Sequence, residues 1–170
     1  MRHSLLRLAG LLAILGLAGP LQAEVANGTV FGDWRVNCTA ESSTRTACAL
    51  TQAVAASEGN RFLAELGLNV LTSDGAKSVV LVLRTPSAML LPLQPGFLIE
   101  GAAEQVSMTW RTCAGDFCTA IQALDEATVA SMRAAPSMIV GYQGVNDPAP
   151  TSFAVSLRGV TAGLTALMAD

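Results

Sequence analysis

Strict alternation of apolar and polar residues is the commonest pattern in this chain. It predicts β-strands, in which successive side chains point to opposite faces. The clearest examples run from Trp34 to Cys38, from Phe62 to Val70, from Val106 to Thr112 and from Phe153 to Leu157. Shorter candidates lie at 47–54, 79–84, 97–100, 118–124 and 137–143, with turn sequences such as 73–75 and 114–116 between strands. About nine short strands of this kind favour a β-sandwich or a β-barrel.

The second of these alternating segments predicts one apolar stripe on a single face of its strand. Its members are Phe62, Ala64, Leu66, Leu68 and Val70. We expect this stripe to face the core.

Two short segments have helical spacing instead. Asp125 is a suitable N-cap for a helix from Glu126 to Ala135, and Pro136 would end that helix. Near the end of the sequence, helical spacing recurs at Val160, Leu164, Leu167 and Met168. We expect both helices to cover an end of the sheet core, and a helix that binds a partner is the alternative.

The first residues have the pattern of a cleavable export signal. Arg2, His3 and Arg7 give a positive start, the run from Leu8 to Leu17 is apolar, and cleavage after Ala23 fits the small-residue rule. The apolar run is shorter than the roughly 20 residues that span a membrane, so a retained anchor is the weaker interpretation. We expect residues 1–23 to be a signal peptide and residues 24–170 to form one domain without a transmembrane segment.

Cleavage also changes the charge and the available chemistry. The chain has 13 acidic and 10 basic residues, and the loss of Arg2 and Arg7 leaves eight basic residues and a formal charge of −5. This balance argues against a nucleic-acid partner, which needs a basic surface. The only histidine, His3, leaves as well, so the mature chain has no imidazole for a nucleophile or a metal site. We therefore predict no catalytic residues, no metal site and no cofactor.

Four cysteines form two local pairs. Of the three connectivities that four cysteines allow, only Cys38 with Cys48 and Cys113 with Cys118 joins neighbours twice. In an exported chain we expect both pairs to be structural disulfides. A redox switch at the second pair and a four-thiolate zinc site are the alternatives, but neither has the usual spacing.

Alternation also assigns a face to each bridge. Cys38 shares the parity of Trp34 and Val36, whereas Cys113 has the opposite parity to Trp110. Because parity decides the face of a strand, we predict that the first bridge is buried and the second lies near the surface.

The segment from Pro86 to Phe97 is the candidate interaction loop. Its three prolines argue against a regular central strand. Its apolar residues are Met89, Leu90, Leu91 and Leu93. Either the segment crosses between sheets and packs on the core, or it forms an exposed patch that meets a partner.

Five segments resemble the invasion-associated locus B family in the same order along the chain. They are Gly32–Cys38, Cys48–Gln52, Leu91–Gly96, Thr112–Cys118 and Ser156–Leu164. The resemblance covers roughly residues 31–168, nearly all of the expected mature chain. It implies an immunoglobulin-like β-sandwich exported by Gram-negative bacteria, and some relatives are linked to host-cell entry and hence to virulence. The family offers no catalytic residues to transfer.

We therefore expect an all-β, immunoglobulin-like β-sandwich of about nine short strands with one or two short helices. The expected function is a non-enzymatic binding protein of the bacterial envelope, periplasmic, secreted or at the cell surface, with a role in host-cell interaction or invasion. Its partner would be a protein or another envelope component. The alternatives are a structural or assembly factor of the periplasm or outer membrane, and an unusual enzyme. For an enzyme, Asp33 and Asp116 are the carboxylates considered, and nothing in the sequence brings them together.

Overall fold

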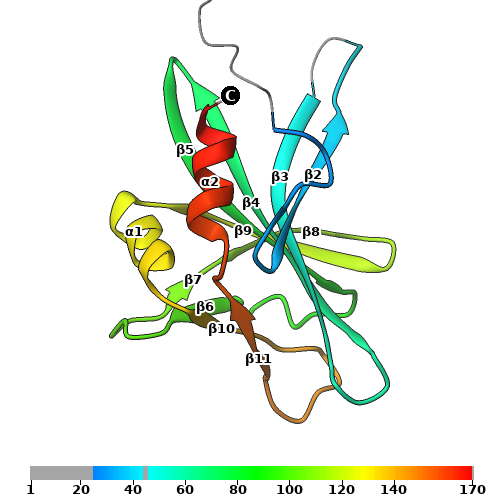
Figure 1. Cartoon of the computed structure of the whole chain (residues 1–170). Coiled ribbons are helices and arrows are strands. Elements are labelled where there is room, and N and C mark those ends of the chain that lie inside the picture. Colours follow the sequence, from blue (N-terminus) through cyan, green and yellow to red (C-terminus); the bar gives the residue numbers. More distant parts are fainter. Residues whose placement is uncertain (1–24, 44–45, 170) are drawn as a thin grey trace, which may run out of the picture.

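Two antiparallel sheets face each other across one apolar core in the computed structural model, which describes residues 25–43 and 46–169 (Figure 1). The larger sheet has the strand order β1 (Val30–Phe31), β2 (Trp34–Ala40), β3 (Thr46–Ala55), β4 (Phe62–Ser73), β5 (Ala76–Pro86), β9 (Phe117–Leu124) and β8 (Thr109–Ala114). The smaller sheet has the order β11 (Thr151–Ser156), β10 (Ser137–Tyr142), β6 (Gly96–Ile99) and β7 (Val106–Ser107). The all-β sandwich of two antiparallel sheets expected from the sequence is confirmed. The expected signal, residues 1–23, lies outside the described residues.

The core consists of alternate strand residues from both sheets. Trp34, Leu66 and Leu81 are fully buried on the larger sheet, and Met138 and Val140 are fully buried on the smaller one. Burying a leucine or methionine side chain contributes about 1.5–3 kcal/mol, so such rows on two facing sheets account for the pairing of the layers.

The described residues form eleven strands rather than about nine. β1 was not predicted, and the predicted strand over 106–112 is divided between β7 and β8. The chain changes sheet at Met108, which is buried and whose N–H donates to the Pro95 carbonyl at 2.8 Å. A strand that bends from one sheet into the other keeps its alternating pattern, so the division is invisible in the sequence.

Both predicted helices are present. α1 spans Glu126–Ala134, and its N-cap, Asp125, accepts a hydrogen bond from the Thr128 N–H at 2.7 Å. α2 spans Val160–Ala169 and packs against the first four strands of the larger sheet (Figure 1). Gly163 allows this close packing, because a Cβ there would lie 2.7 Å from Leu50 Cδ1.

A β-bulge at Leu63 corrects the predicted stripe on β4. Val54 of β3 pairs with Ala64, and the next residue, Ala55, pairs with Phe62, so Leu63 is the extra residue. The bulge reverses the alternation, and Phe62 leaves the core-facing stripe. Its ring instead meets Phe117 edge-on, with 5.9 Å between ring centroids.

Candidate functional site: a trough on the smaller sheet

The segment between β5 and β6 crosses from the larger to the smaller sheet and is hydrogen-bonded along its length. At its start, the Ser87 N–H donates to the Asp116 carbonyl at 2.8 Å. Further on, the Leu90 N–H donates to the Gln143 carbonyl at 2.8 Å. Such anchoring at several points holds the segment in one conformation.

The four apolar residues of the candidate interaction loop divide between the two predicted environments. Met89 is 8% exposed and packs in the core, and Leu90 is half-buried. Leu91 and Leu93 are 47% and 50% exposed. The first half of the loop therefore covers the core, and the second half presents two leucines to solvent.

A tight turn holds these two leucines in place. The Leu93 N–H donates to the Leu90 carbonyl at 2.9 Å, and Gln94 Nε2 donates to the Leu91 carbonyl at 3.3 Å. Trp110 fixes the far side, because its Nε1 donates to the Leu93 carbonyl at 3.0 Å and its backbone N–H to Gln94 Oε1 at 3.1 Å. Both leucines are thus preorganised for contact.

Next to this turn, a trough crosses the outer face of the smaller sheet. Its floor is the cross-strand row in which Ser152 of β11 pairs with Gly141 of β10 and Gly141 pairs with Gly96 of β6. The row continues beyond the hollow, where Gly96 pairs with Ser107 of β7. Directly paired residues share a face, so small residues follow one another across all four strands. With neighbouring strands about 4.8 Å apart, the floor from Ser152 to Gly96 is about 10 Å long.

The two walls of the trough differ in chemistry. On one side, Ile139 pairs with Leu98, and these side chains are 47% and 38% exposed. On the other side lie Leu93, Gln94, Gln143 and Pro150. The hollow between them has a volume of about 470 Å³. It combines one apolar wall with one wall that carries amide groups.

No ionised side chain lines the trough within the part of the chain that the structure describes. Among the described residues, Tyr142 is the one titratable residue that borders the trough, and its hydroxyl is buried and donates to the Leu63 carbonyl at 2.9 Å. Burial raises the pKa of this hydroxyl, while Arg61 lowers it and Asp147 raises it. Gln105 lies over the floor, because a Cβ at Gly96 would overlap its amide nitrogen. The site therefore suits an uncharged ligand with apolar groups.

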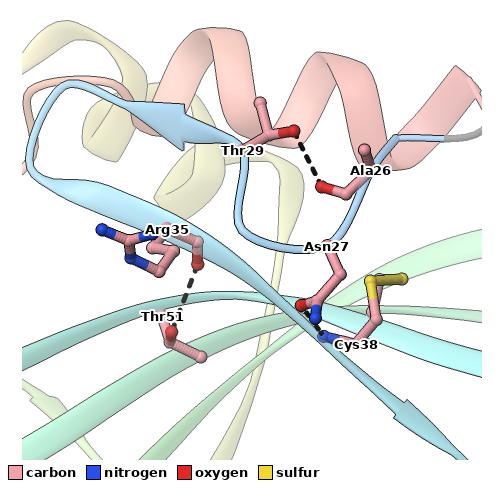
Figure 2. The surroundings of a disulfide bond; sticks show 7 residues. Ala26, Asn27, Thr29, Arg35, Cys38 and Thr51 are labelled. Carbon is pink, nitrogen blue, oxygen red and sulfur yellow. Dashed lines mark hydrogen bonds between the residues drawn. A yellow bond between two sulfur atoms is a disulfide. The ribbon is translucent and has the colours of Figure 1, made fainter.

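The structure contains both expected disulfides, Cys38–Cys48 and Cys113–Cys118, each with a Cα–Cα distance of 4.0 Å. The first bridge joins β2 to β3 and is half-buried, and Asn27 Oδ1 accepts from the Cys38 N–H at 3.0 Å beside it (Figure 2). In the second bridge Cys113 is exposed and Cys118 is fully buried.

The predicted contrast between a buried and a surface bridge is therefore wrong in that form. For the second bridge, a β-bulge is the reason. Trp110 pairs with Ala120 and Thr112 with Thr119, which leaves Arg111 as the extra residue. The bulge reverses parity and returns Cys113 to the face of Trp110. Cys113 is nevertheless exposed because it lies on an edge strand.

Asp33 and Asp116, the two carboxylates considered for an enzyme, have separate structural surroundings. Arg158 and then Ser156 donate to the Asp33 carboxylate and hold its pKa below the usual range. Asp116 lies in the turn of the second disulfide hairpin. All four cysteines are in disulfides, and the described residues hold no cluster of three or more potential metal ligands.

Two segments that carried the family resemblance meet in space. Asp33 binds Arg158, and Trp34 Nε1 donates to the Ser156 carbonyl at 2.9 Å. A Cβ at Gly32 would overlap the Arg158 carbonyl, so only glycine permits this approach. These residues join the two sheets, and none of them lines the trough.

Sequence reasoning missed the trough. Of its floor residues only Gly141 lies within a predicted strand, and Gly96 and Ser152 fall just before two others. The row Ser152–Gly141–Gly96 also depends on strand register, which alternation does not supply. The only local signal was a glycine inside a predicted strand, at Gly141, which is typical of a close approach or a hollow.

Comparison with known proteins gives consistent results. The family model for the invasion associated locus B (IalB) protein matches residues 34–168. Invasion protein B homologs from two Brucella abortus strains, 2308 and biovar 1 strain 9-941, are each 28% identical over 144 residues, covering 82% of this chain and 78% of theirs. The crystal structure of invasion associated protein B from Bartonella henselae superposes with a TM-score of 0.70 at 22% identity, over 83% of this chain and 94% of that one. This chain therefore has the same fold as that protein.

The match of the family model begins at Trp34, the first residue of β2, and extends into α2. Within the described residues, no helix has the length and apolar character needed to cross a membrane. The chain belongs to the invasion associated locus B family.

Proposed function

We propose that this protein is an exported, non-enzymatic binding protein of the bacterial envelope whose trough and adjoining leucines contact another protein. The observation that carries the proposal is the exposed apolar surface made of Leu93, Leu98 and Ile139 around an uncharged hollow, with Leu91 exposed on the adjoining turn. Contiguous exposed apolar surface marks interaction sites in soluble proteins.

The rigid presentation of this surface supports binding further. The turn at Leu91 and Leu93 is fixed by Trp110 and Gln94, so little conformational entropy is lost when a partner covers it. The two disulfides and the expected signal support an oxidising, extracytoplasmic compartment. The names of the Brucella and Bartonella relatives associate those proteins with invasion, and we extend host-cell contact to this chain as part of the proposal.

Binding by two matched leucine variants tests the proposal. Labelled mature protein is applied to cultured mammalian cells and to the outer-membrane fraction of the producing bacterium. Leu93→Ser changes a trough residue that is 50% exposed, and Leu71→Ser changes a leucine of β4 that is 52% exposed and lies outside the trough. We expect Leu93→Ser alone to weaken binding, by about tenfold for a contact worth about 1.4 kcal/mol.

The two surfaces separate the possible roles. Binding to mammalian cells supports host contact, whereas binding to the membrane fraction alone supports an assembly role in the envelope. Equal losses for both variants, or no binding to either surface, would contradict the proposed site.

A further inference from the structure

β11 forms one edge of the smaller sheet, and it is the longer of the two edges (Figure 1). It has 6 residues, whereas β7 at the opposite edge has 2. The backbone groups on the outer side of β11 therefore determine what this edge can bind.

The hydrogen-bond pattern shows which groups point outward. The Leu157 N–H donates to the Pro136 carbonyl at 2.9 Å, just beyond the ladder in which Val155 pairs with Met138. In an antiparallel ladder, alternate residues of a strand bond to the same neighbour. Val155, Phe153 and Thr151 therefore bond to β10, whereas Ser152, Ala154 and Ser156 point their N–H and C=O groups away from it.

One end of this outer edge is occupied, and the rest is open. The Ser156 carbonyl accepts from Trp34 Nε1 at 2.9 Å and from Gln52 Nε2 at 3.4 Å, in agreement with its outward direction. For Ser152 and Ala154, no residue in the described part of the chain bonds to either N–H or to either carbonyl. Four backbone groups at two alternate residues are thus available for pairing.

The edge strand β8 of the larger sheet is covered at its start. The outward N–H of Trp110 on β8 donates to Gln94 Oε1, and the N–H of Met108 just before β8 donates to the Pro95 carbonyl. Exposed edges are usually also protected by charged residues, proline or bulges. β11, Thr151–Ser156, contains no charged residue and no proline, and its register with β10 is regular.

The trough opens onto this same edge. Ser152 is the first residue of the floor row and pairs with Gly141, so nothing larger than a serine side chain separates the edge from the hollow. A side chain opposite Ser152 on an added strand would lie at this opening. Gly141 would lie two strand spacings, about 10 Å, from the added strand, so a long side chain such as methionine or phenylalanine is needed to reach over Ser152 to Gly141.

We propose that β11 receives an uncharged, extended segment of a partner protein as an added strand, which pairs with Ser152 and Ala154 and places one large apolar side chain in the trough. This inference rests on the proposed function and names the form of the partner. Strand addition supplies affinity through the backbone and specificity through the side chain that enters a pocket.

The first test measures exchange of backbone amides together with peptide binding. The probe is a phage-displayed library of random linear dodecapeptides selected on the mature protein. In the free protein, the amides of Ser152 and Ala154 should exchange rapidly, and those of Phe153 and Val155 slowly. A bound peptide should protect the first two. Selected peptides should share a large apolar residue in an uncharged stretch, and N-methylation should abolish binding only at alternate positions.

The matched variants are Ala154→Pro and Ala154→Ser. Proline removes the outward N–H and is tolerated on an edge, whereas serine keeps this N–H. We expect Ala154→Pro to weaken peptide binding about tenfold and Ala154→Ser to leave it unchanged. Equal binding to all three proteins, no selected peptide, or N-methylation effects at every position would overturn the inference.

Two further outcomes separate this inference from the proposed function. If Ile139→Ser weakens peptide binding and Ala154→Pro does not, the trough binds partners but strand addition is wrong. A dimer of the mature protein that Ala154→Pro dissociates would show that β11 pairs with a second copy, which also overturns the inference. Sedimentation velocity of the wild-type protein and of Ala154→Pro shows whether such a dimer forms and dissociates.

Discussion

Asp33 and Arg158 are 125 positions apart in the chain and form a bidentate ion pair where β2 begins. Arg158 Nη2 donates to Asp33 Oδ1 at 2.6 Å, and its Nε donates to Oδ2 at 3.1 Å. The Ser156 hydroxyl donates to the same carboxylate at 2.6 Å. Ser156 is the last residue of β11 and Arg158 follows it, whereas Asp33 directly precedes β2. These bonds to Asp33 therefore tie the first strands of the larger sheet to the last strand of the smaller one.

This pair should make stability depend on pH. Arg158, and then Ser156, hold the pKa of Asp33 below its ordinary value of 3.8. A carboxylate with a lowered folded-state pKa stabilises the protein above its unfolded-state pKa and loses that effect as pH falls through the folded-state value. We expect Asp33→Asn to lower Tm near neutral pH, with a difference from wild type that shrinks below pH 3.8.

A double-mutant cycle supplies the control. Arg158→Gln alone should show a similar pH dependence, and adding it to Asp33→Asn should cost little more, because the interaction is already lost. Thermal unfolding, followed by circular dichroism from neutral pH to below pH 3.8, gives the Tm of the wild type, the two single variants and the double variant. A difference that stays constant with pH would argue against the assigned role of the carboxylate.

Gly159→Ala should destabilise the protein strongly. Gly159 has a φ of 102°, and a Cβ there would overlap the Phe31 carbonyl. The left-handed backbone and the steric overlap together should cost about 3 kcal/mol. Gly101→Ala is the matched control, since its φ is 86° but a Cβ would meet nothing within 4 Å. We expect about 1 kcal/mol there from the backbone alone. Urea unfolding compares the two, and equal losses would contradict a close approach at Gly159.

Alternation predicted most strands correctly because burial on one face repeats every second residue. It failed at two bulges. The bulge at Leu63 changes the face of Phe62, and the bulge at Arg111 changes the face of Cys113. The caps and breakers at Asp125 and Pro136 are local signals, so α1 was predicted well. The trough was not predictable, because its glycines become neighbours only through the register of separate strands.

Tyr142→Phe should reveal how the bulge at Leu63 is stabilised. The hydroxyl of Tyr142 crosses from the smaller sheet and donates to the Leu63 carbonyl at 2.9 Å in a buried hydrogen bond. Phenylalanine would leave a buried carbonyl without this partner, at a cost of about 1–3 kcal/mol. Thr29→Val is the control, because the Thr29 hydroxyl donates to the Ala26 carbonyl at 2.7 Å in an exposed position (Figure 2). Its loss should stay within about 0.5 kcal/mol. Similar losses in chemical unfolding would show that the Tyr142 bond contributes little.

The loop before β6 should separate into a stabilising half and a binding half. Met89→Ala removes a side chain that is 8% exposed and should cost about 2–5 kcal/mol. Leu91→Ser changes a side chain that is 47% exposed and should change stability by less than about 0.5 kcal/mol. Differential scanning calorimetry gives both values. If Leu91→Ser is as destabilising as Met89→Ala, then Leu91 belongs to the core and not to the binding surface.

The disulfide Cys113–Cys118 should be reduced before Cys38–Cys48. A thiolate must reach one sulfur atom of a bridge, and Cys113 is exposed whereas both Cys38 and Cys48 are half-buried. Timed reduction by dithiothreitol, alkylation and peptide mass spectrometry give the order. The same experiment on Arg111→Gly controls for charge next to Cys113, since removing a cation changes attack by an anionic thiolate but leaves Cys113 exposed. The order should therefore persist in this variant. Faster reduction of Cys38–Cys48 in the wild type would show that local opening of β2 and β3, rather than static exposure, controls access to the bridges.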